Sequence, residues 1–153
     1  MELYNSPLHV KEIFGRWLSQ ERNSGFGAYI PFVGIVREEH GIEALSFDIY
    51  EPVLRNWFQA WEAKAAQDGA VVKMAHAIGD VPIGSTSYMS AVFSKGRKVA
   101  LALIEDFVED FKASAPIWKY DVIDGKRIYA RERSMPMRGA GILKDIDEGI
   151  QAK

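Results

Sequence analysis

Residues 99–130 read VALALIEDFVEDFKASAPIWKYDVIDGKRIYA, and this stretch decides the fold. Across residues 99–111 an apolar residue recurs every four positions, and four carboxylates at 105, 106, 109 and 110 lie largely on the opposite side, which predicts an amphipathic helix. Pro116 ends that helix because proline cannot continue one. Two strand-like runs then flank Asp124-Gly125, a pair that favours the type I′ turn of a β-hairpin. The stretch therefore predicts a helix that leads directly into a hairpin.

Elements of both kinds lie outside this stretch. An apolar stripe at helical spacing follows Ser6-Pro7, and we expect Ser6 to cap this first helix. A second such stripe follows Pro52, where the second helix is expected to begin. Residues 79–84 are rich in turn formers and predict a loop. The predicted strands cover residues 28–36, 42–50, 70–76, 86–93, 117–123 and 126–130. Three main helices and strands joined by short connections indicate an α+β protein with a largely antiparallel sheet.

The chain length predicts one domain. We expect it to span residues 1–133, followed by a C-terminal loop and tail, residues 134–153, that pack on or near the active site. Pro31 and Gly34 interrupt the first long strand, which indicates a sheet edge or a bulge.

Composition excludes several function classes. The 153 residues are 48% hydrophobic and 26% charged, as in globular proteins, and the formal net charge of −2 gives no general attraction to nucleic acid. The absence of cysteine excludes a disulfide framework, a thiolate metal site and a cysteine nucleophile. No apolar run is long enough to span a membrane and no secretory signal pattern opens the chain. We therefore expect a cytoplasmic protein.

Positive charge is concentrated between residues 112 and 138, which hold seven cations and three anions. A local basic cluster on an acidic chain indicates a specific anionic ligand, although solvated hairpin faces explain such clusters equally often. Lys112 ends the predicted helix, and Lys119 follows beyond the proline. If the two amines converge on a pocket, repulsion and burial lower their pKa values and suit them to acid–base or nucleophilic chemistry. Otherwise, Lys112 is an ordinary solvated helix-end lysine.

Arginines and histidines complete the candidate residues. Arg37 and Arg97 are further anion ligands, because the planar guanidinium fork suits phosphate. His9, His40 and His76 lie on different elements without ligand spacing, so we expect no metal. The sequence has no P-loop and no glycine-rich dinucleotide fingerprint, and we expect no cofactor. His76, in an apolar strand, is interpreted as a hydrogen-bonded structural residue.

Three segments carry a resemblance to a known family: GAYIPFVGIVR at residues 27–37, LSFDIY at 45–50 and FKASAPIWK at 111–119. Together they resemble the large, catalytic subunit of molybdopterin synthase, and the order of elements agrees from about residue 8 to residue 133. The third segment is the most specific, because a helix-end lysine precedes Ala-Pro-x-Trp-Lys in that family.

The resemblance implies an α/β-hammerhead fold and a sulfurtransferase. It implies a homodimer in which each subunit binds a small ubiquitin-like sulfur carrier, giving a heterotetramer. The carrier's Gly-Gly tail ends in a thiocarboxylate and threads into the pocket, where sulfur passes to cyclic pyranopterin monophosphate to form the molybdopterin dithiolene.

The resemblance also assigns residue roles. It implies that Lys112 and Lys119 are catalytic and that Arg37, Arg97 and Arg131 bind the substrate.

Two departures from the family pattern leave alternatives open. Gly96 and Ala77 stand where the family usually has histidine and arginine. These departures motivate one alternative, a non-catalytic paralogue that keeps the fold and the partner groove. The basic cluster alone motivates the other, an unrelated phosphate- or nucleotide-binding module.

Overall fold

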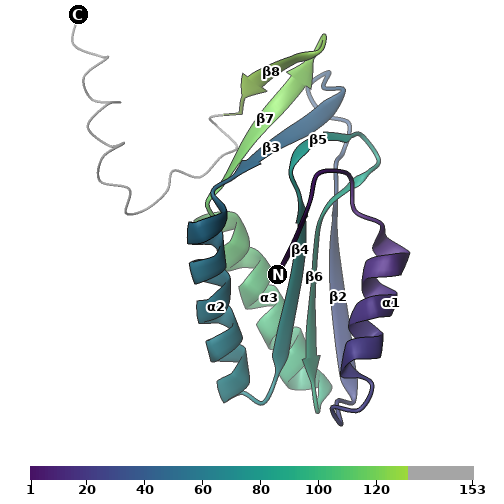
Figure 1. Cartoon of the computed structure of the whole chain (residues 1–153), viewed down its shortest axis with the longest axis vertical. Helices are drawn as coiled ribbons and strands as arrows, with labels where there is room; N and C mark the ends of the chain where they lie inside the picture. The colour runs from purple at the N-terminus through teal and green to yellow at the C-terminus, as the bar shows by residue number, and fades with distance from the viewer. Residues whose placement is uncertain (131–153) are drawn as a thin grey trace, which may run out of the picture.

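The computed structural model describes residues 1–130, which form three helices and eight strands (Figure 1). In chain order these are β1 (Glu2–Tyr4), α1 (Val10–Glu21), β2 (Ala28–Ile35), β3 (Ala44–Ile49), α2 (Glu51–Gln67), β4 (Val71–Ala77), β5 (Gly79–Pro82), β6 (Thr86–Ser94), α3 (Arg97–Ser114), β7 (Ile117–Ile123) and β8 (Lys126–Tyr129). The predicted α+β class with three main helices is confirmed. The predicted C-terminal loop and tail lie outside the described residues.

The strands form two sheets rather than one. The first has the order β1-β4-β6-β2 and the second the order β5-β3-β7-β8, with every pair antiparallel except β1 and β4. In Figure 1 the second sheet stands above the first. The chain passes from β4 to β5 through Ile78 and Gly79, and the positive φ of 79° at Gly79 is one that glycine adopts without strain.

The helices cover both faces of the first sheet. Helices α2 and α3 pack on one face and α1 on the other (Figure 1). Leu54 and Phe107 are fully buried in the α2–α3 layer, and Trp17 is buried in the α1 layer. Burial of these apolar side chains is the main stabilising contribution, at roughly 25 cal/mol per Å² removed from water. The sheet thereby becomes a rigid base for the residues at its upper end.

Some predicted details differ from the structure. Helix α1 begins at Val10 with His9 at the N-cap, and the Ser6 hydroxyl donates to the Pro7 carbonyl instead of capping the helix. The segment predicted as a loop at residues 79–84 contains β5, which pairs with β3. Strand β1 was also not predicted. Both strands are three or four residues long, too short for a periodic signal, and exist because a neighbouring strand pairs with them.

Other details are confirmed. Strand β2 is an edge strand, and its register shifts between Gly34 and Ile35, as Pro31 and Gly34 predict. The hairpin turn has positive φ at both Asp124 and Gly125, 49° and 69°, which a type I′ turn requires. Among residues 1–130, no helix is both long and apolar enough to cross a membrane.

Candidate active site

A cavity of about 700 Å³ opens where the two sheets meet the C-terminal end of α3. Its walls come from the end of β2 and the following residues, the middle of β3, the ends of β4 and β6 that face the second sheet, the last turns of α3, and the start of β7. Its charged lining residues are Arg37, Glu39, Lys112 and Lys119. Segments far apart in the sequence therefore build one site.

The turn between α3 and β7 brings the two lysines to this cavity. Lys112 lies in the last turn of α3, where a cation interacts favourably with the helix dipole. Ala115 adopts an extended conformation and Pro116 is buried, so the chain reverses directly into β7. Lys119 pairs in register with Phe47 of β3, and its carbonyl accepts the Ala130 N–H at 3.0 Å. Lys112 is exposed and Lys119 half-buried on the same cavity wall.

Arg37 lies at the mouth of the cavity. It lies two residues after the end of β2, and its side chain is 81% exposed and ion-paired with Glu39. Glu39 was not predicted as a site residue, although its position two residues after a candidate anion ligand offered a signal. Exposed ion pairs contribute little to stability, so the guanidinium can exchange this partner for a bound phosphate.

One further predicted arginine falls within the described residues, and it does not line the cavity. Arg97 is exposed in the first turn of α3, and fifteen residues of helix place it about 22 Å from Lys112 along the axis. Gly96, the N-cap residue, lies at the same distant end. Arg131 lies outside the described residues. Ala77 is fully buried and is not among the residues that line the cavity, whereas its neighbour His76 is.

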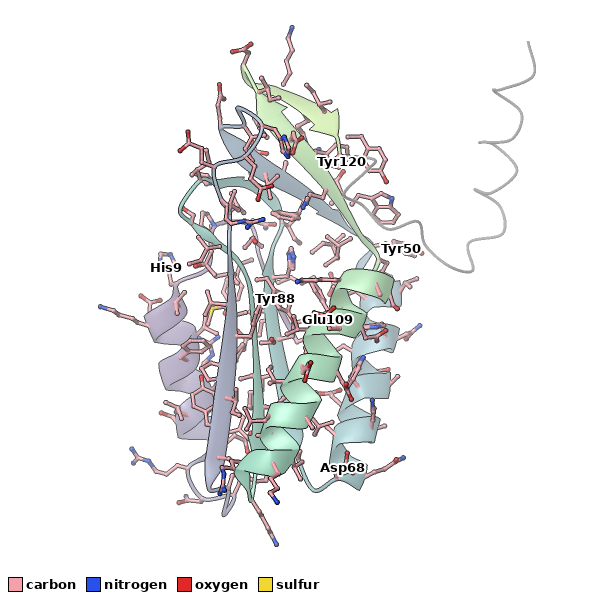
Figure 2. All side chains as sticks on the ribbon, turned by 180° about the vertical axis from the view of Figure 1, so that it is seen from behind. His9, Tyr50, Asp68, Tyr88, Glu109 and Tyr120 are labelled. Carbon is pink, nitrogen blue, oxygen red and sulfur yellow. The ribbon has the colours of Figure 1, made fainter. Side chains whose placement is uncertain are left out.

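An aromatic wall completes the cavity. Tyr88 stacks on Phe111 with ring centroids 4.1 Å apart, and Figure 2 shows Tyr88 on the sheet beside the C-terminal half of α3. His76 contacts both rings and meets Phe47 edge-on at 5.0 Å. Its Nδ1 lies 2.6 Å from the Ala77 carbonyl, which confirms the predicted hydrogen-bonded histidine, but its place on the cavity wall was not predicted.

The electrostatics of the site favour an anion. Three cations face one carboxylate, and that carboxylate is already paired with Arg37. Burial lowers the pKa of His76 to about 4, so its imidazole is neutral at pH 7 and adds no charge. Among the described residues, no three histidine or acidic side chains gather where they could hold a metal ion. The arrangement can hold a small anion beside two amines.

The fold and the cavity thus define an α+β protein with a cationic, aromatic-walled pocket. The family model described as "MoaE protein" matches residues 3–114. A molybdopterin synthase catalytic subunit of Helicobacter pylori strain 26695 is 49% identical over 143 residues, covering 94% of this chain and 99% of the relative. One from strain J99 is 38% identical over the same coverage. The chain belongs to the MoaE family, as the three sequence segments indicated.

Solved structures agree with this assignment. A complex of subunits 1 and 2 of the molybdopterin-converting factor from H. pylori 26695 contains a chain that matches with a TM-score of 0.88 and 49% identity. The match covers 93% of this chain and 97% of that chain. Molybdopterin synthase from Staphylococcus aureus matches with a TM-score of 0.72 and 25% identity, covering 84% and 94%. Membership of this family excludes the alternative of an unrelated phosphate-binding module.

Proposed function

We propose that this chain is the catalytic subunit of a molybdopterin synthase and transfers sulfur to cyclic pyranopterin monophosphate. The observation that carries the proposal is that Lys112 and Lys119, from either side of Pro116, line the same cavity as Arg37 in a member of the MoaE family. Sulfur arrives as the C-terminal thiocarboxylate of a small ubiquitin-like carrier. Two transfers to adjacent carbons and opening of the cyclic phosphate give the dithiolene.

Each cavity cation has a separate role in this proposal. Arg37 binds the substrate phosphate through charge-assisted hydrogen bonds at the cavity mouth. Lys112 transfers a proton or stabilises the acyl group of the carrier, because its exposed amine can reach a tail that enters the cavity. Lys119 supplies positive charge from the opposite side of the turn. Holding carrier and substrate together supplies much of the rate, because the reaction becomes effectively unimolecular.

A second copy of the chain brings Arg97 to the site. The outer edge of β2 has no strand partner within residues 1–130, and such edges are commonly covered by another chain. Ala28, the first residue of β2, pairs with Ser94, the last residue of β6. Arg97 comes three residues after Ser94 and therefore lies near the start of β2, whereas Arg37 lies beyond its end. If two copies meet along their β2 edges with two-fold symmetry, those edges run antiparallel. Arg97 of one copy then approaches the Arg37 end of the other.

Further parts of the proposal come from the family. The solved relative from H. pylori is a complex of two subunits, which supports a small carrier subunit as the partner of this chain. A homodimer with two carriers, a heterotetramer, follows from the resemblance. The roles of Arg131 and of residues 134–153 near the active site stay predictions, as does a cytoplasmic location.

Reconstitution tests the proposal. The purified chain is combined with thiocarboxylated carrier and cyclic pyranopterin monophosphate, and dithiolene formation is measured. We expect product from the wild type and none from a carrier that lacks its final two glycines. Binding of carrier and substrate without any product would instead identify a non-catalytic paralogue. Product formation by the truncated carrier would contradict entry of the tail into the cavity.

A further inference from the structure

His76 occupies an unusual place for a buried histidine. It lies at the end of β4, its exposed fraction is 2%, and it nevertheless forms part of the wall of the cavity that holds Lys112 and Lys119. Three aromatic rings surround it: Phe47 edge-on, and Tyr88 and Phe111 with centroids 6.0 and 5.7 Å away. These contacts fix the orientation of the imidazole, so its two nitrogens have fixed positions.

The contacts of the ring also fix its tautomer. Nδ1 lies 2.6 Å from the Ala77 carbonyl, and a carbonyl can only accept, so Nδ1 carries the hydrogen and donates it. In the neutral imidazole Nε2 then has no hydrogen and offers a lone pair. Within residues 1–130 no group donates a hydrogen bond to Nε2.

The other polar groups of the cavity make this lone pair distinctive. Arg37, Lys112 and Lys119 can only donate hydrogen bonds, and the Glu39 carboxylate is engaged by Arg37 at the mouth. The hydroxyls of Ser87 and Tyr88, which also line the cavity, can either donate or accept, whereas Nε2 of the neutral His76 can only accept. A ligand held by those cations alone is recognised through its anionic and acceptor groups. A pterin ring also carries N–H donors, which must find acceptors when the ring is buried. His76 provides an acceptor on the inner wall, opposite in hydrogen-bonding character to the lysines.

We propose that His76 is a substrate-binding residue whose Nε2 accepts a hydrogen bond from an N–H or O–H donor of the pterin ring. The inference rests on the proposed function, because that function supplies the pterin. The hydrogen bond holds the ring against the inner wall of the cavity and so contributes to substrate binding. His76 positions the substrate and does not exchange protons with it, because a buried imidazole that stays neutral is a weak base.

Nitrogen-15 NMR of the wild-type protein tests this without any substitution. With ¹⁵N-histidine labelling, we expect His76 to show a protonated Nδ1 and an unprotonated Nε2. Adding cyclic pyranopterin monophosphate without carrier should move the Nε2 resonance towards that of a hydrogen-bonded nitrogen. His9, exposed at the N-cap of α1 and not among the residues that line the cavity, is the reference in the same spectrum and should not move.

Titration calorimetry on the same samples measures substrate binding, and so distinguishes failure of the role of His76 from failure of the proposed function. Saturable substrate binding with an unchanged Nε2 resonance would overturn the role of His76 and leave the proposed function intact. No substrate binding at all would contradict the proposed function itself, and the inference with it.

Two variants give an independent readout. His76→Phe keeps the ring and removes the acceptor, so KM should rise about tenfold with kcat little changed, since the pterin donor is left unpaired. His76→Gln can place an amide oxygen near the position of Nε2 and should recover most of that loss. Equal KM values for wild type and a folded His76→Phe would contradict the inference.

Discussion

The buried imidazole of His76 makes a prediction about stability and pH. Its pKa is about 4 in the folded chain, against 6.5 for an unhindered histidine, because burial penalises the charged form. Between these values the unfolded chain takes up a proton and the folded chain does not. Stability is therefore at its full value above about pH 6.5 and is lost progressively as the pH falls to about 4.

The size of this effect follows from the shift. At 1.36 kcal/mol per pKa unit, a shift of about 2.5 units lowers the free energy of unfolding by about 3 kcal/mol below pH 4. That is a large fraction of the 5–15 kcal/mol that is typical of a domain. Because carboxylates titrate over the same range, the quantity to measure is the difference between wild type and His76→Phe.

Urea unfolding followed by tryptophan fluorescence supplies that difference. We expect the free energy of unfolding of the wild type, relative to His76→Phe, to fall by about 3 kcal/mol between pH 7 and pH 3.5. The same substitution at exposed His9 is the matched control, because no buried charge is involved there. A wild-type minus His76→Phe difference that stays constant across this range would refute the burial argument, as would a native His76 that titrates above pH 6 by NMR.

Two further predictions concern other parts of the chain. Gly27→Ala should destabilise the fold by about 1–3 kcal/mol in urea unfolding, because its Cβ would lie 2.8 Å from the Lys95 carbonyl oxygen. Gly15→Ala, where a Cβ meets no atom within 4 Å in the interior of α1, should stabilise by about 0.5–1 kcal/mol, and equal effects of the two would contradict the steric argument. Co-expressed Arg97→Ala and Lys112→Ala chains should show more turnover at low substrate concentration than either variant alone, since a mixed dimer restores one complete site. If the two variants are shown to form mixed dimers and turnover still does not increase, Arg97 does not belong to the site.

Local sequence signals predicted the elements that depend on local physics. The i, i+4 apolar stripe of α3, the stop at Pro116 and the Asp124-Gly125 turn each depend on nearby residues, and all three are observed. The short strands β1 and β5 depend on pairing with distant strands, so no local pattern revealed them. The division into two sheets depends on which distant strands pair with each other, so the sequence does not reveal it.

The site residues also differ in whether nearby or distant parts of the chain place them at the cavity. Lys112 and Lys119 are seven positions apart across one chain reversal; their spacing left open whether they converge, the family resemblance implied that they do, and both line one cavity. His76 reaches the cavity through the register of β4 beside β6, a long-range fact that its apolar neighbours in sequence do not reveal. Arg97 matches a family motif, yet α3 carries it away from the cavity of its own chain.

The central claim is that Lys112 takes part in the chemistry and does more than neutralise the phosphate. The most direct measurement is the turnover of Lys112→Arg with thiocarboxylated carrier and saturating substrate, after confirming that the variant folds and binds the carrier. Arginine keeps the charge but stays protonated at any working pH and is a poor nucleophile. We predict a loss of at least about a hundredfold in kcat, the scale of removing a general acid or base. Near-normal turnover would contradict the chemical role of Lys112 and leave only an electrostatic one.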